Sequence, residues 1–383
     1  MQVSQLQPSE FNTLLAIEEG HFLDFKAREI QPAKVTRTVS AFANTDGGRL
    51  LVGIKQASGG GDKAWQGFDS VEQANGLLQA IESVLPFSQG CQIDLMSTEG
   101  HAGIVVQVEV FKSREIVKAT NGEVYIRRGA QNLPVRDETT LERLKLNKGL
   151  SSFETRTVDA AEEVITNSEA TIGFMLEIVP HQEPELWLRK QNLIVERKPT
   201  VAGAILFADE PQSILPKHCG VKVYRYRTSS TEGTREALHG LPETIEGCAY
   251  KQVYDCVRKT KDIIEAIGRM SSEGLESVRY PEETLHEIIT NAILHRDYSL
   301  PDDIHIRIYD NRVEVESPGS LPGHITPGNI LNERFARNGN IVRLINRFPN
   351  PPNKDIGEGL NTAFNAMARL HLKVTCPHLI RQG

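Results

Sequence analysis

Segments with helical spacing alternate with short strand-like segments along the whole chain, and this alternation restricts the fold to the mixed α/β (α+β) class. Near the N-terminus, a helix is expected at Pro32–Asn44, and a strand at Arg49–Ile54 follows the turn Asp46-Gly47-Gly48. The longest apolar runs, such as Val201–Ala208, are far shorter than the roughly 18 residues that a membrane helix needs. We therefore expect a mixed α/β protein without a membrane partner.

The length of 383 residues predicts two or three domains. We divide the chain into an α/β module at 1–135, an α/β connector at 136–275 and a C-terminal helix-on-sheet domain at 276–383. The connector is expected to contain helices at 139–147, 158–166, 169–194 and 243–269, and strands at Val201–Phe207 and Gly220–Tyr226. The C-terminal domain is expected to open with a helix at Pro281–Leu294, followed by strands at Ile304–Tyr309 and Arg312–Ser317.

The formal net charge of −7 argues against a protein that coats phosphates with its whole surface. The five cysteines are spread along the chain without CxxC spacing, which favours reduced thiols over a disulfide frame or a zinc site. The first residues lack the basic and apolar stretches of a signal peptide. These features predict a cytoplasmic protein.

A row of polar residues at four-residue spacing is the strongest chemical signal. Glu287, Asn291 and His295 share one face of the helix expected at Pro281–Leu294. A carboxamide oxygen can ligate Mg²⁺, and a carboxylate can accept a proton from an attacking water. The alternative is a solvated helix face that ends in a histidine favoured by the helix dipole.

Three further segments follow this helix in order. Pro318-Gly319 forms a turn after a strand, 332–340 is a polar, basic segment suited to a mobile lid, and Gly357-Glu358-Gly359 precedes a helix. Glycines before a helix N-terminus expose backbone N–H groups to a phosphate. The order of the four features is more specific than any one of them.

This order resembles the GHKL ATPase fold of gyrase, heat-shock chaperones and histidine kinases. The segments 291–298 and 317–322, with Arg337-Asn338 and 357–359, more closely resemble the ATP-binding half of bacterial proteins described as RecG-related or as transcriptional regulators. The resemblance implies ATP and Mg²⁺ as cofactors and a homodimer as the assembly. It also implies a role for each matching residue: Glu287 as general base, Asn291 as Mg²⁺ ligand, His295 in the ATP site, Gly319 near adenine or ribose, Arg334 and Arg337 as lid cations, and Gly357 and Gly359 as the phosphate cradle.

The adenine loop departs from the GHKL pattern, in which an aspartate precedes the glycine. The chain reads Glu316-Ser317-Pro318-Gly319, so either Glu316 or Ser317 would contact adenine. Relatives commonly continue into a winged helix, whereas this chain stops at Gly383 soon after the matching region. We expect that winged helix to be absent.

A locally basic stretch lies within the acidic total. Residues 21–56 carry six Lys/Arg against three acids, and Arg127 and Arg128 follow later. Basic side chains on one module are typical of phosphate binding, although an ordinary solvated surface is the alternative. The candidates for nucleic-acid contact are Lys26, Arg28, Lys34, Arg37, Arg49, Arg127 and Arg128.

Residues 10–135 closely resemble the AlbA-like domain of Schlafen proteins, through Asp24-Phe25-Lys26, the segments 40–48 and 50–54, and 125–129. The resemblance implies nucleic-acid binding, and some members are metal-dependent RNA nucleases with two acids five residues apart. Glu19 and Asp24 have that spacing. The position of the third acid in those nucleases corresponds to Lys55 or Gln56, neither of which has a carboxylate. Asp62 is therefore the remaining candidate for the third acid. Asp24 has a structural alternative, pairing with Lys26 or Arg49.

Three functions remain open on the sequence. The first is an ATP-binding and ATP-hydrolysing protein in which nucleotide controls the engagement of DNA or RNA. The second is a Schlafen-like metal-dependent nuclease that acts in phage defence. The third is a DNA-binding transcriptional regulator with ATP as a ligand only. Hydrolysis of ATP would indicate the first function and cleavage of nucleic acid the second. Binding to a defined operator without either activity would indicate the third. We favour the first function.

Overall fold

The computed structural model describes residues 3–56, 63–87, 89–215, 219–271, 274–352, 359–370 and 372. The chain divides into two compact units. The N-terminal unit comprises Met1–Ser151 together with Gly323–Thr326, and the C-terminal unit comprises Ser152–Pro322 and Pro327–Gly383. The chain therefore leaves the C-terminal unit after Pro322 and returns to it at Pro327.

A five-stranded mixed sheet forms the centre of the N-terminal unit, with strand order β1-β6-β7-β3-β2. β1 runs parallel to β6 and β2 runs parallel to β3, while β7 is antiparallel to both of its neighbours. The elements of this unit are β1 (Val3–Leu6), α1 (Pro8–Ala16), β2 (Leu23–Lys26), α2 (Pro32–Asn44), β3 (Gly48–Val52), β4 (Ile54–Gln56), β5 (Lys63–Trp65), α3 (Asn75–Val84), β6 (Cys91–Thr98), β7 (His101–Val110), β8 (Tyr125–Arg128), β9 (Gln131–Pro134) and α4 (Glu138–Lys148).

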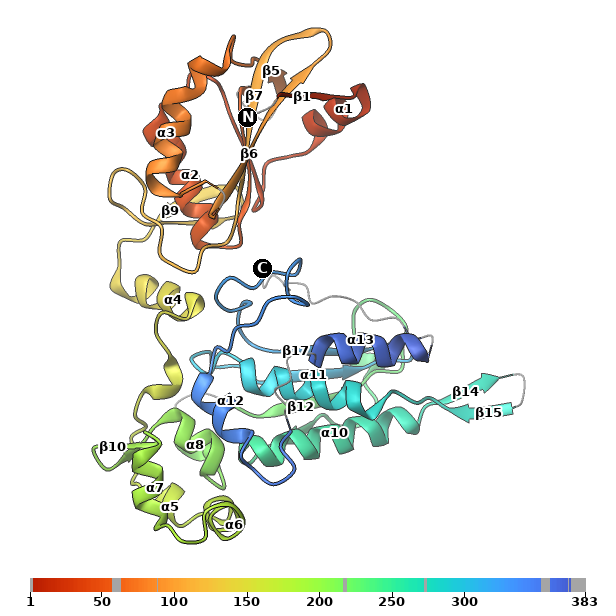
Figure 1. Cartoon of the computed structure of the whole chain (residues 1–383). Helices are drawn as coiled ribbons and strands as arrows, with labels where there is room; N and C mark the ends of the chain where they lie inside the picture. The colour runs from red at the N-terminus through yellow and green to blue at the C-terminus, as the bar shows by residue number, and fades with distance from the viewer. Residues whose placement is uncertain are drawn as a thin grey trace. The chain divides into compact units, whose positions relative to one another are not determined.

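Helices cover both faces of this sheet (Figure 1). Val39 and Phe42 of α2, together with Leu77 and Leu78 of α3, pack on one face. Leu14 and Leu15 of α1 pack against the smaller core on the other face. The alternation of side chains along each strand produces these two cores, because successive residues point to opposite faces of a sheet.

The polar residues of α2 explain the segment 40–48. Ser40 Oγ donates to Val117 O at 2.8 Å, and Asn44 Nδ2 donates to Val117 O at 2.7 Å and to Tyr125 O at 2.9 Å. These bonds satisfy backbone carbonyls of the loop before β8 and of its first residue, which would otherwise be buried without partners. Gly47 has φ +79°, and a Cβ there would lie 2.8 Å from Val110 O, so the turn into β3 requires glycine.

A four-stranded sheet of order β13-β12-β16-β17 forms the centre of the C-terminal unit. β12 runs parallel to β16, whereas β13 and β17 are antiparallel to their neighbours. The elements of this unit are α5 (Glu163–Thr166), α6 (Glu169–Ile178), α7 (Pro184–Lys190), β10 (Ile194–Val195), β11 (Lys198–Pro199), α8 (Val201–Phe207), α9 (Pro211–Ile214), β12 (Val221–Arg225), β13 (Glu243–Ile245), α10 (Ala249–Glu265), β14 (Gly268–Ser271), β15 (Gly274–Ser277), α11 (Glu282–His295), β16 (Ile304–Ile308), β17 (Val313–Glu316), α12 (Gly339–Ile345) and α13 (Gly359–Arg369).

Helices α10 and α11 lie side by side against one face of this sheet (Figure 1). Val221 and Val223 of β12 and Ile304 and Ile306 of β16 belong to the same buried core as Ile289 of α11. The alternate residues of these strands are only partly buried. The mixed α/β class expected from the sequence is confirmed, and helices rest on a sheet in this unit as well.

Several expected elements are corrected by the structure. Val201–Phe207 forms helix α8 and not a strand: Thr200 caps it by accepting from the Gly203 N–H at 3.2 Å, and every residue of the helix is buried. A short apolar run has no periodicity that separates a buried helix from a buried strand. The helix expected at 169–194 is divided into α6 and α7, the one at 158–166 is reduced to α5, and 243–269 begins with strand β13 before α10.

The expected connector and C-terminal domain belong to one compact unit in the structure. The reason is that β12, which lies before residue 275, pairs with β16, which lies after it. Helix α4 belongs to the N-terminal unit, so this unit extends beyond residue 135. Within the described parts of the chain, none of the helices combines the length and the apolar character that a membrane crossing demands.

Candidate functional site

Glu287 and Asn291 lie on one face of α11, as their spacing predicted. The Asn291 Nδ2 group donates to Glu287 Oε1 at 2.7 Å. Ile289 and Ile293 are buried on the core side of the same helix. Helical periodicity alone brings the carboxylate and the carboxamide together, so this part of the site is decided locally.

The surroundings of Glu287 favour its neutral form. Burial raises the pKa of this carboxyl group above its usual range, and the hydrogen bond from Asn291 only partly opposes the effect. A carboxylate with a raised pKa is a better proton acceptor near neutral pH than an ordinary glutamate. The bond between the two residues uses the Asn291 amide nitrogen and not its oxygen, which is the atom that a hard cation would take.

His295 is the last residue of α11, and its Nδ1 atom is buried without a hydrogen-bond partner among the residues that the structure describes. Burial, together with the positive charge of Arg337, lowers the pKa of His295 to about 4. The imidazole is therefore neutral near pH 7. A neutral ring contributes no positive charge toward a phosphate, so a role in the ATP site would have to rely on hydrogen bonding.

The glycine turn after β17 packs against the residues that follow α11. The Asp297 N–H donates to Pro318 O at 2.8 Å, and Ser317 Oγ donates to Ala292 O at 2.9 Å. Gly319 has φ +115°, and a Cβ there would lie 2.8 Å from Asp297 Cβ. The turn requires glycine because the backbone approaches Asp297 so closely.

Both alternatives for the adenine contact have partners within the protein. Arg307 Nη1 donates to Glu316 Oε2 at 2.5 Å across β16 and β17. Ser317 is engaged with Ala292, as described above. Both side chains are therefore already engaged in contacts within the C-terminal unit, beside the glycine turn.

Arg337 lies in the interior of the C-terminal unit and not on an exposed lid. Its side chain is 6% exposed; Nη1 lies 3.4 Å from Asp297 Oδ2, and Nη2 donates to Ser320 O at 2.6 Å. The next residue, Asn338, donates to Leu294 O at 2.8 Å and to Arg296 O at 2.9 Å. This pair secures the end of α11 to the glycine turn, whereas Arg334 is exposed.

Of the two glycines expected to cradle phosphates, Gly359 is among the residues that the structure describes. Gly357 falls outside the described residues, and Gly359 is the first residue of α13. This helix packs against α11, where Thr284 Oγ1 donates to Ala363 O at 3.3 Å. Asn361 Nδ2 donates to Leu331 O at 3.2 Å, which ties the first turn of α13 to the segment before Arg334.

Glu154 is a residue of this unit that the sequence analysis missed. Its side chain is 2% exposed, and its carboxylate accepts from the N–H groups of Asn340 at 2.8 Å and Ile341 at 2.9 Å. It thereby caps the first turn of α12, directly after Arg337 and Asn338. Burial raises the pKa of Glu154. Because the partners are far apart in sequence, no spacing could have indicated the contact.

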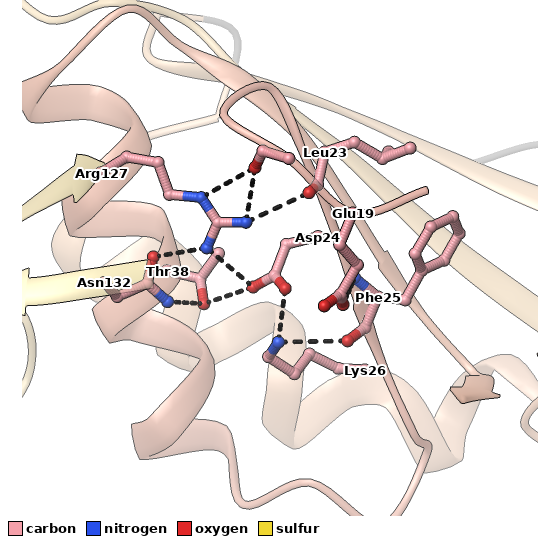
Figure 2. Close-up of polar contacts among 9 residues, drawn as sticks. Glu19, Leu23, Asp24, Phe25, Lys26, Thr38, Arg127 and Asn132 are labelled. Carbon is pink, nitrogen blue, oxygen red and sulfur yellow. Dashed lines mark hydrogen bonds and ion pairs between the residues drawn. The ribbon is translucent and has the colours of Figure 1, made fainter. Parts of the chain in front are cut away.

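Asp24 is the centre of a buried polar network in the N-terminal unit (Figure 2). Its side chain is 2% exposed; Oδ1 accepts from Lys26 Nζ at 2.6 Å, and Oδ2 accepts from Thr38 Oγ1 at 3.0 Å. Arg127 Nη1 lies 3.6 Å from Oδ2, and Asn132 Nδ2 donates to Thr38 Oγ1 at 2.8 Å. Of the two alternatives for Asp24, pairing with Lys26 is the one that the structure contains.

Glu19 lies beside Asp24, and its carboxylate accepts from the Phe25 N–H at 2.8 Å. Burial raises the pKa of Glu19, and the neighbouring Asp24 carboxylate raises it further. No cluster of three His, Cys, Asp or Glu side chains suited to a metal occurs within the described ranges. Lys55, at the position of the missing third acid, is exposed on β4, and Asp62 lies outside the described residues. Because both Asp24 oxygens already have donors, these residues do not fit a divalent metal.

Arg127 is a structural residue of this network. Its guanidinium donates to Gly20 O at 2.8 and 3.1 Å, to Leu23 O at 3.1 Å and to Asn132 Oδ1 at 2.8 Å, as Figure 2 shows for the labelled residues. The residue is 3% exposed, and burial lowers its pKa. It therefore holds β8 against the loop before β2 and is not available to a phosphate.

The other basic candidates divide into two groups. Lys26 is engaged with Asp24, and Arg28 donates to Gly67 O at 3.2 Å and lies 3.3 Å from Asp69. Arg28 is nevertheless exposed, and the other exposed candidates are Lys34, Arg37, Arg49 and Arg128. Lys34 and Arg37 are three residues apart on α2, so they lie on adjacent positions of one helix face. Lys34, Arg37, Arg49 and Arg128 are the candidates that we retain for contact with phosphates.

Two family models match the chain, one in each unit. Residues 19–136 match the family described as "Schlafen, AlbA_2", and residues 302–381 match the family described as "Putative ATP-dependent DNA helicase recG C-terminal". The second match begins after α11, so it includes the glycine turn and α13 but not Glu287 or Asn291. No curated protein matches the chain.

Two solved structures are similar to the chain. The DIP2311 protein from Corynebacterium diphtheriae is 19% identical with a TM-score of 0.44, over 92% of this chain and 72% of that one. The N-terminal domain of a RecG-related protein from Nitrosomonas europaea is 24% identical with a TM-score of 0.25, over 33% of this chain and 88% of that one. The family models confirm the expected resemblance to Schlafen AlbA_2 proteins over residues 19–136 and to RecG-related proteins over residues 302–381.

Proposed function

We propose that this protein binds ATP in a GHKL-type site of its C-terminal unit, hydrolyses it, and uses the nucleotide to control the engagement of DNA or RNA by its N-terminal unit. The names of the two matching families, one tied to an ATP-dependent DNA helicase and the other to Schlafen proteins, support this combination. The observation that carries the proposal is the contact between Glu287 and Asn291 on α11.

The chemistry of these residues fits ATP with Mg²⁺. When bound, the nucleotide and its metal would supply the phosphoryl group and the neutralisation of its charge. The oxygen of Asn291 is suited to ligate the cation, and the Glu287 carboxylate is suited to orient a water and accept its proton. The exposed Arg334 can supply a cation to the phosphates.

The test is nucleotide binding and hydrolysis by the full chain. A fluorescent ATP analogue should bind in the presence of Mg²⁺, and phosphate release should follow. Asn291→Ala should weaken binding and abolish hydrolysis, whereas Asn311→Ala, in the hairpin turn of the same unit, should leave both unchanged. An Asn291→Ala protein that hydrolyses ATP at the native rate would refute the proposal.

For the nucleic-acid partner, we propose that the exposed cations Lys34, Arg37, Arg49 and Arg128 contact phosphates. Phosphate contacts make affinity fall steeply with salt concentration. Electrophoresis with duplex DNA, single-stranded DNA and tRNA, each with and without ATP and Mg²⁺, tests binding and its nucleotide dependence together. Binding that is insensitive to salt would contradict this interface.

Nuclease activity is the second candidate, because Glu19 and Asp24 are neighbouring acids. The donors on both Asp24 oxygens oppose it, so we expect binding without cleavage. The same electrophoresis with Mg²⁺ or Mn²⁺ decides the matter. Cleavage that disappears in the double variant Glu19→Ala with Asp24→Ala would establish the nuclease in place of the nucleotide-controlled binder.

We also propose a homodimer, on the basis of the GHKL resemblance. Sedimentation velocity with and without a non-hydrolysable ATP analogue tests it. A monomer under both conditions at micromolar concentration would contradict the dimer while leaving the nucleotide site untouched.

A further inference from the structure

A four-residue segment, Gly323–Thr326, lies in the second half of the sequence but belongs to the N-terminal unit. We refer to it as the strap. The Gly323 N–H donates to Asn147 O at 2.8 Å, next to the end of α4. Ile325 is buried, with 5% of its surface exposed. The strap is therefore a packed part of the N-terminal unit and not a passing loop.

Two side chains from the loop after β7 hold the strap. Lys112 Nζ donates to Ile325 O at 3.4 Å, and Arg114 Nε donates to His324 Nδ1 at 3.1 Å. The Lys112 ammonium also lies 3.6 Å from Asp46 Oδ1. Its side chain is 6% exposed, so this cation links the strap to the Asp46-Gly47-Gly48 turn from within the unit. The turn continues directly into β3, whose Arg49 is one of the exposed cations.

Both flanks of the strap belong to the candidate nucleotide site of the C-terminal unit. The glycine turn with Gly319 precedes it, and the segment that carries Arg334, Arg337 and Asn338 follows it. The upstream flank is anchored by the bonds of Asp297 to Pro318 and of Arg337 to Ser320.

Prolines stiffen both ends of the strap. Pro322 precedes Gly323, and Pro327 follows Thr326. A proline ring fixes its own φ and also restricts the residue before it to extended conformations. Few backbone dihedral angles next to the strap can therefore rotate freely. A movement of either flank is transmitted to Gly323 or Thr326.

We propose that the strap couples the nucleotide site to the Asp46-Gly47-Gly48 turn, and through it to the basic surface beside β3. This inference rests on the proposed function and names the element that transmits it. In this proposal, the segments that flank the strap have two arrangements, and nucleotide shifts their populations by binding one arrangement more tightly than the other. The strap transmits that shift to Lys112 and Asp46. Because coupling is reciprocal, nucleic acid must change the affinity for nucleotide by the same factor.

The test replaces residues 323–326 of the full chain by Gly-Ser-Gly-Ser and measures both affinities. In the native protein, a non-hydrolysable ATP analogue with Mg²⁺ should change the dissociation constant for DNA or tRNA by at least about fivefold. In the strap variant, each ligand alone should bind within about twofold of native, while the coupling factor falls to about 1. The matched control replaces residues 229–232, an exposed loop segment of the C-terminal unit, by the same four residues and should keep the native factor.

Each outcome decides between the two proposals. If the strap variant binds both ligands and keeps the native coupling factor, the proposed role of the strap is refuted. A native protein that binds both ligands with a factor near 1, or binds no nucleotide, overturns the proposed function and the strap with it. If the strap variant does not fold, hydrogen exchange of the native protein decides. Addition of the analogue should change exchange in peptides that cover 42–49 and 110–114, and unchanged exchange there would refute the strap.

Discussion

The buried carboxylate of Asp24 and the partly buried carboxylate of Glu287 differ in how fully cations and hydrogen-bond donors compensate them. Asp24 accepts from Lys26 and Thr38 and lies close to Arg127, so its charge is compensated within the N-terminal unit. Glu287 has the neutral Asn291 as its side-chain donor, and burial raises its pKa. A carboxylate whose charge is compensated by cations and donors stabilises a fold, whereas a carboxylate with a raised pKa is available to accept a proton.

The comparison teaches that the residue type and the spacing of acids do not separate a structural cluster from a catalytic one. Glu19 and Asp24 have the spacing of a nuclease pair, yet their neighbours bring cations and hydroxyl donors. Glu287 and Asn291 have only helical spacing, yet they remain without a compensating cation in the contacts that the structure gives them. The predictions below break or sharpen this contrast, from the largest expected effect to the smallest.

Glu287→Gln should reduce ATP hydrolysis by about 10²- to 10⁴-fold while nucleotide binding persists, because the amide cannot accept the proton of the attacking water. Single-turnover phosphate release and equilibrium binding separate the two effects. Glu283→Gln changes an exposed glutamate on the same helix and serves as the control. Native turnover in Glu287→Gln would place the general base elsewhere.

Arg127→Ala should lower the free energy of unfolding by about 3–5 kcal/mol, since it leaves the Asp24 carboxylate and the carbonyls of Gly20 and Leu23 without their buried donor. Urea denaturation measures the loss. Arg128→Ala removes the adjacent exposed arginine and should change stability by at most about 0.5 kcal/mol. Equal, small effects of the two variants would contradict the structural role of the Asp24 network.

Gly319→Ala should destabilise the protein by about 1–3 kcal/mol, because the new Cβ meets Asp297 and the residue has a left-handed backbone. Gly173→Ala offers the opposite case: it lies in α6, and its Cβ would meet nothing within 4 Å. That substitution should stabilise by about 0.5–1 kcal/mol. Thermal unfolding of both variants checks the pair, and a neutral Gly319→Ala would refute the tight approach at the glycine turn.

Lys148 is a buried cation that offers a pH-dependent test, and its ammonium group donates to the backbone carbonyls of Ala43 and Ser113. Burial lowers its pKa from 10.5 to about 7. Between these values the unfolded chain binds the extra proton, so the free energy of unfolding should rise with pH above 7, by at most about 1.4 kcal/mol per pH unit. Lys148→Met should lose this rise in denaturation curves measured from pH 6.5 to 9. A pH profile unchanged by Lys148→Met would contradict the lowered pKa.

Lys34→Ala combined with Arg128→Ala should reduce the salt dependence of DNA binding, by about one unit of the logarithmic slope for each phosphate contact that is lost. Fluorescence anisotropy at several salt concentrations measures the slope. Lys190→Ala, an exposed lysine of the C-terminal unit, should leave it unchanged. If the double variant keeps the native salt dependence, the nucleic-acid interface does not include α2 and the β8–β9 hairpin.

Much of the C-terminal site was predictable because its key contact is local. Helical periodicity places Glu287 above Asn291 whatever the rest of the fold does. The two strands expected at Ile304–Tyr309 and Arg312–Ser317 are separated only by Asp310-Asn311, a hairpin turn signal, and they pair as β16 and β17. In contrast, the roles of Thr38, Asn132 and Glu154 were missed, because their partners lie on other elements and no spacing connects them.

Sequence patterns by themselves determined the α/β class and the pairing of Glu287 with Asn291, since each depends on neighbours a few residues away. Only the tertiary structure decided that Val201–Phe207 is a helix, that Arg127 and Arg337 are buried anchors and that the strap belongs to the N-terminal unit. The physical reason is that burial and charge compensation depend on groups brought together from distant parts of the chain. A basic residue looks the same in sequence whether its charge is held by a buried carboxylate or remains free for a phosphate.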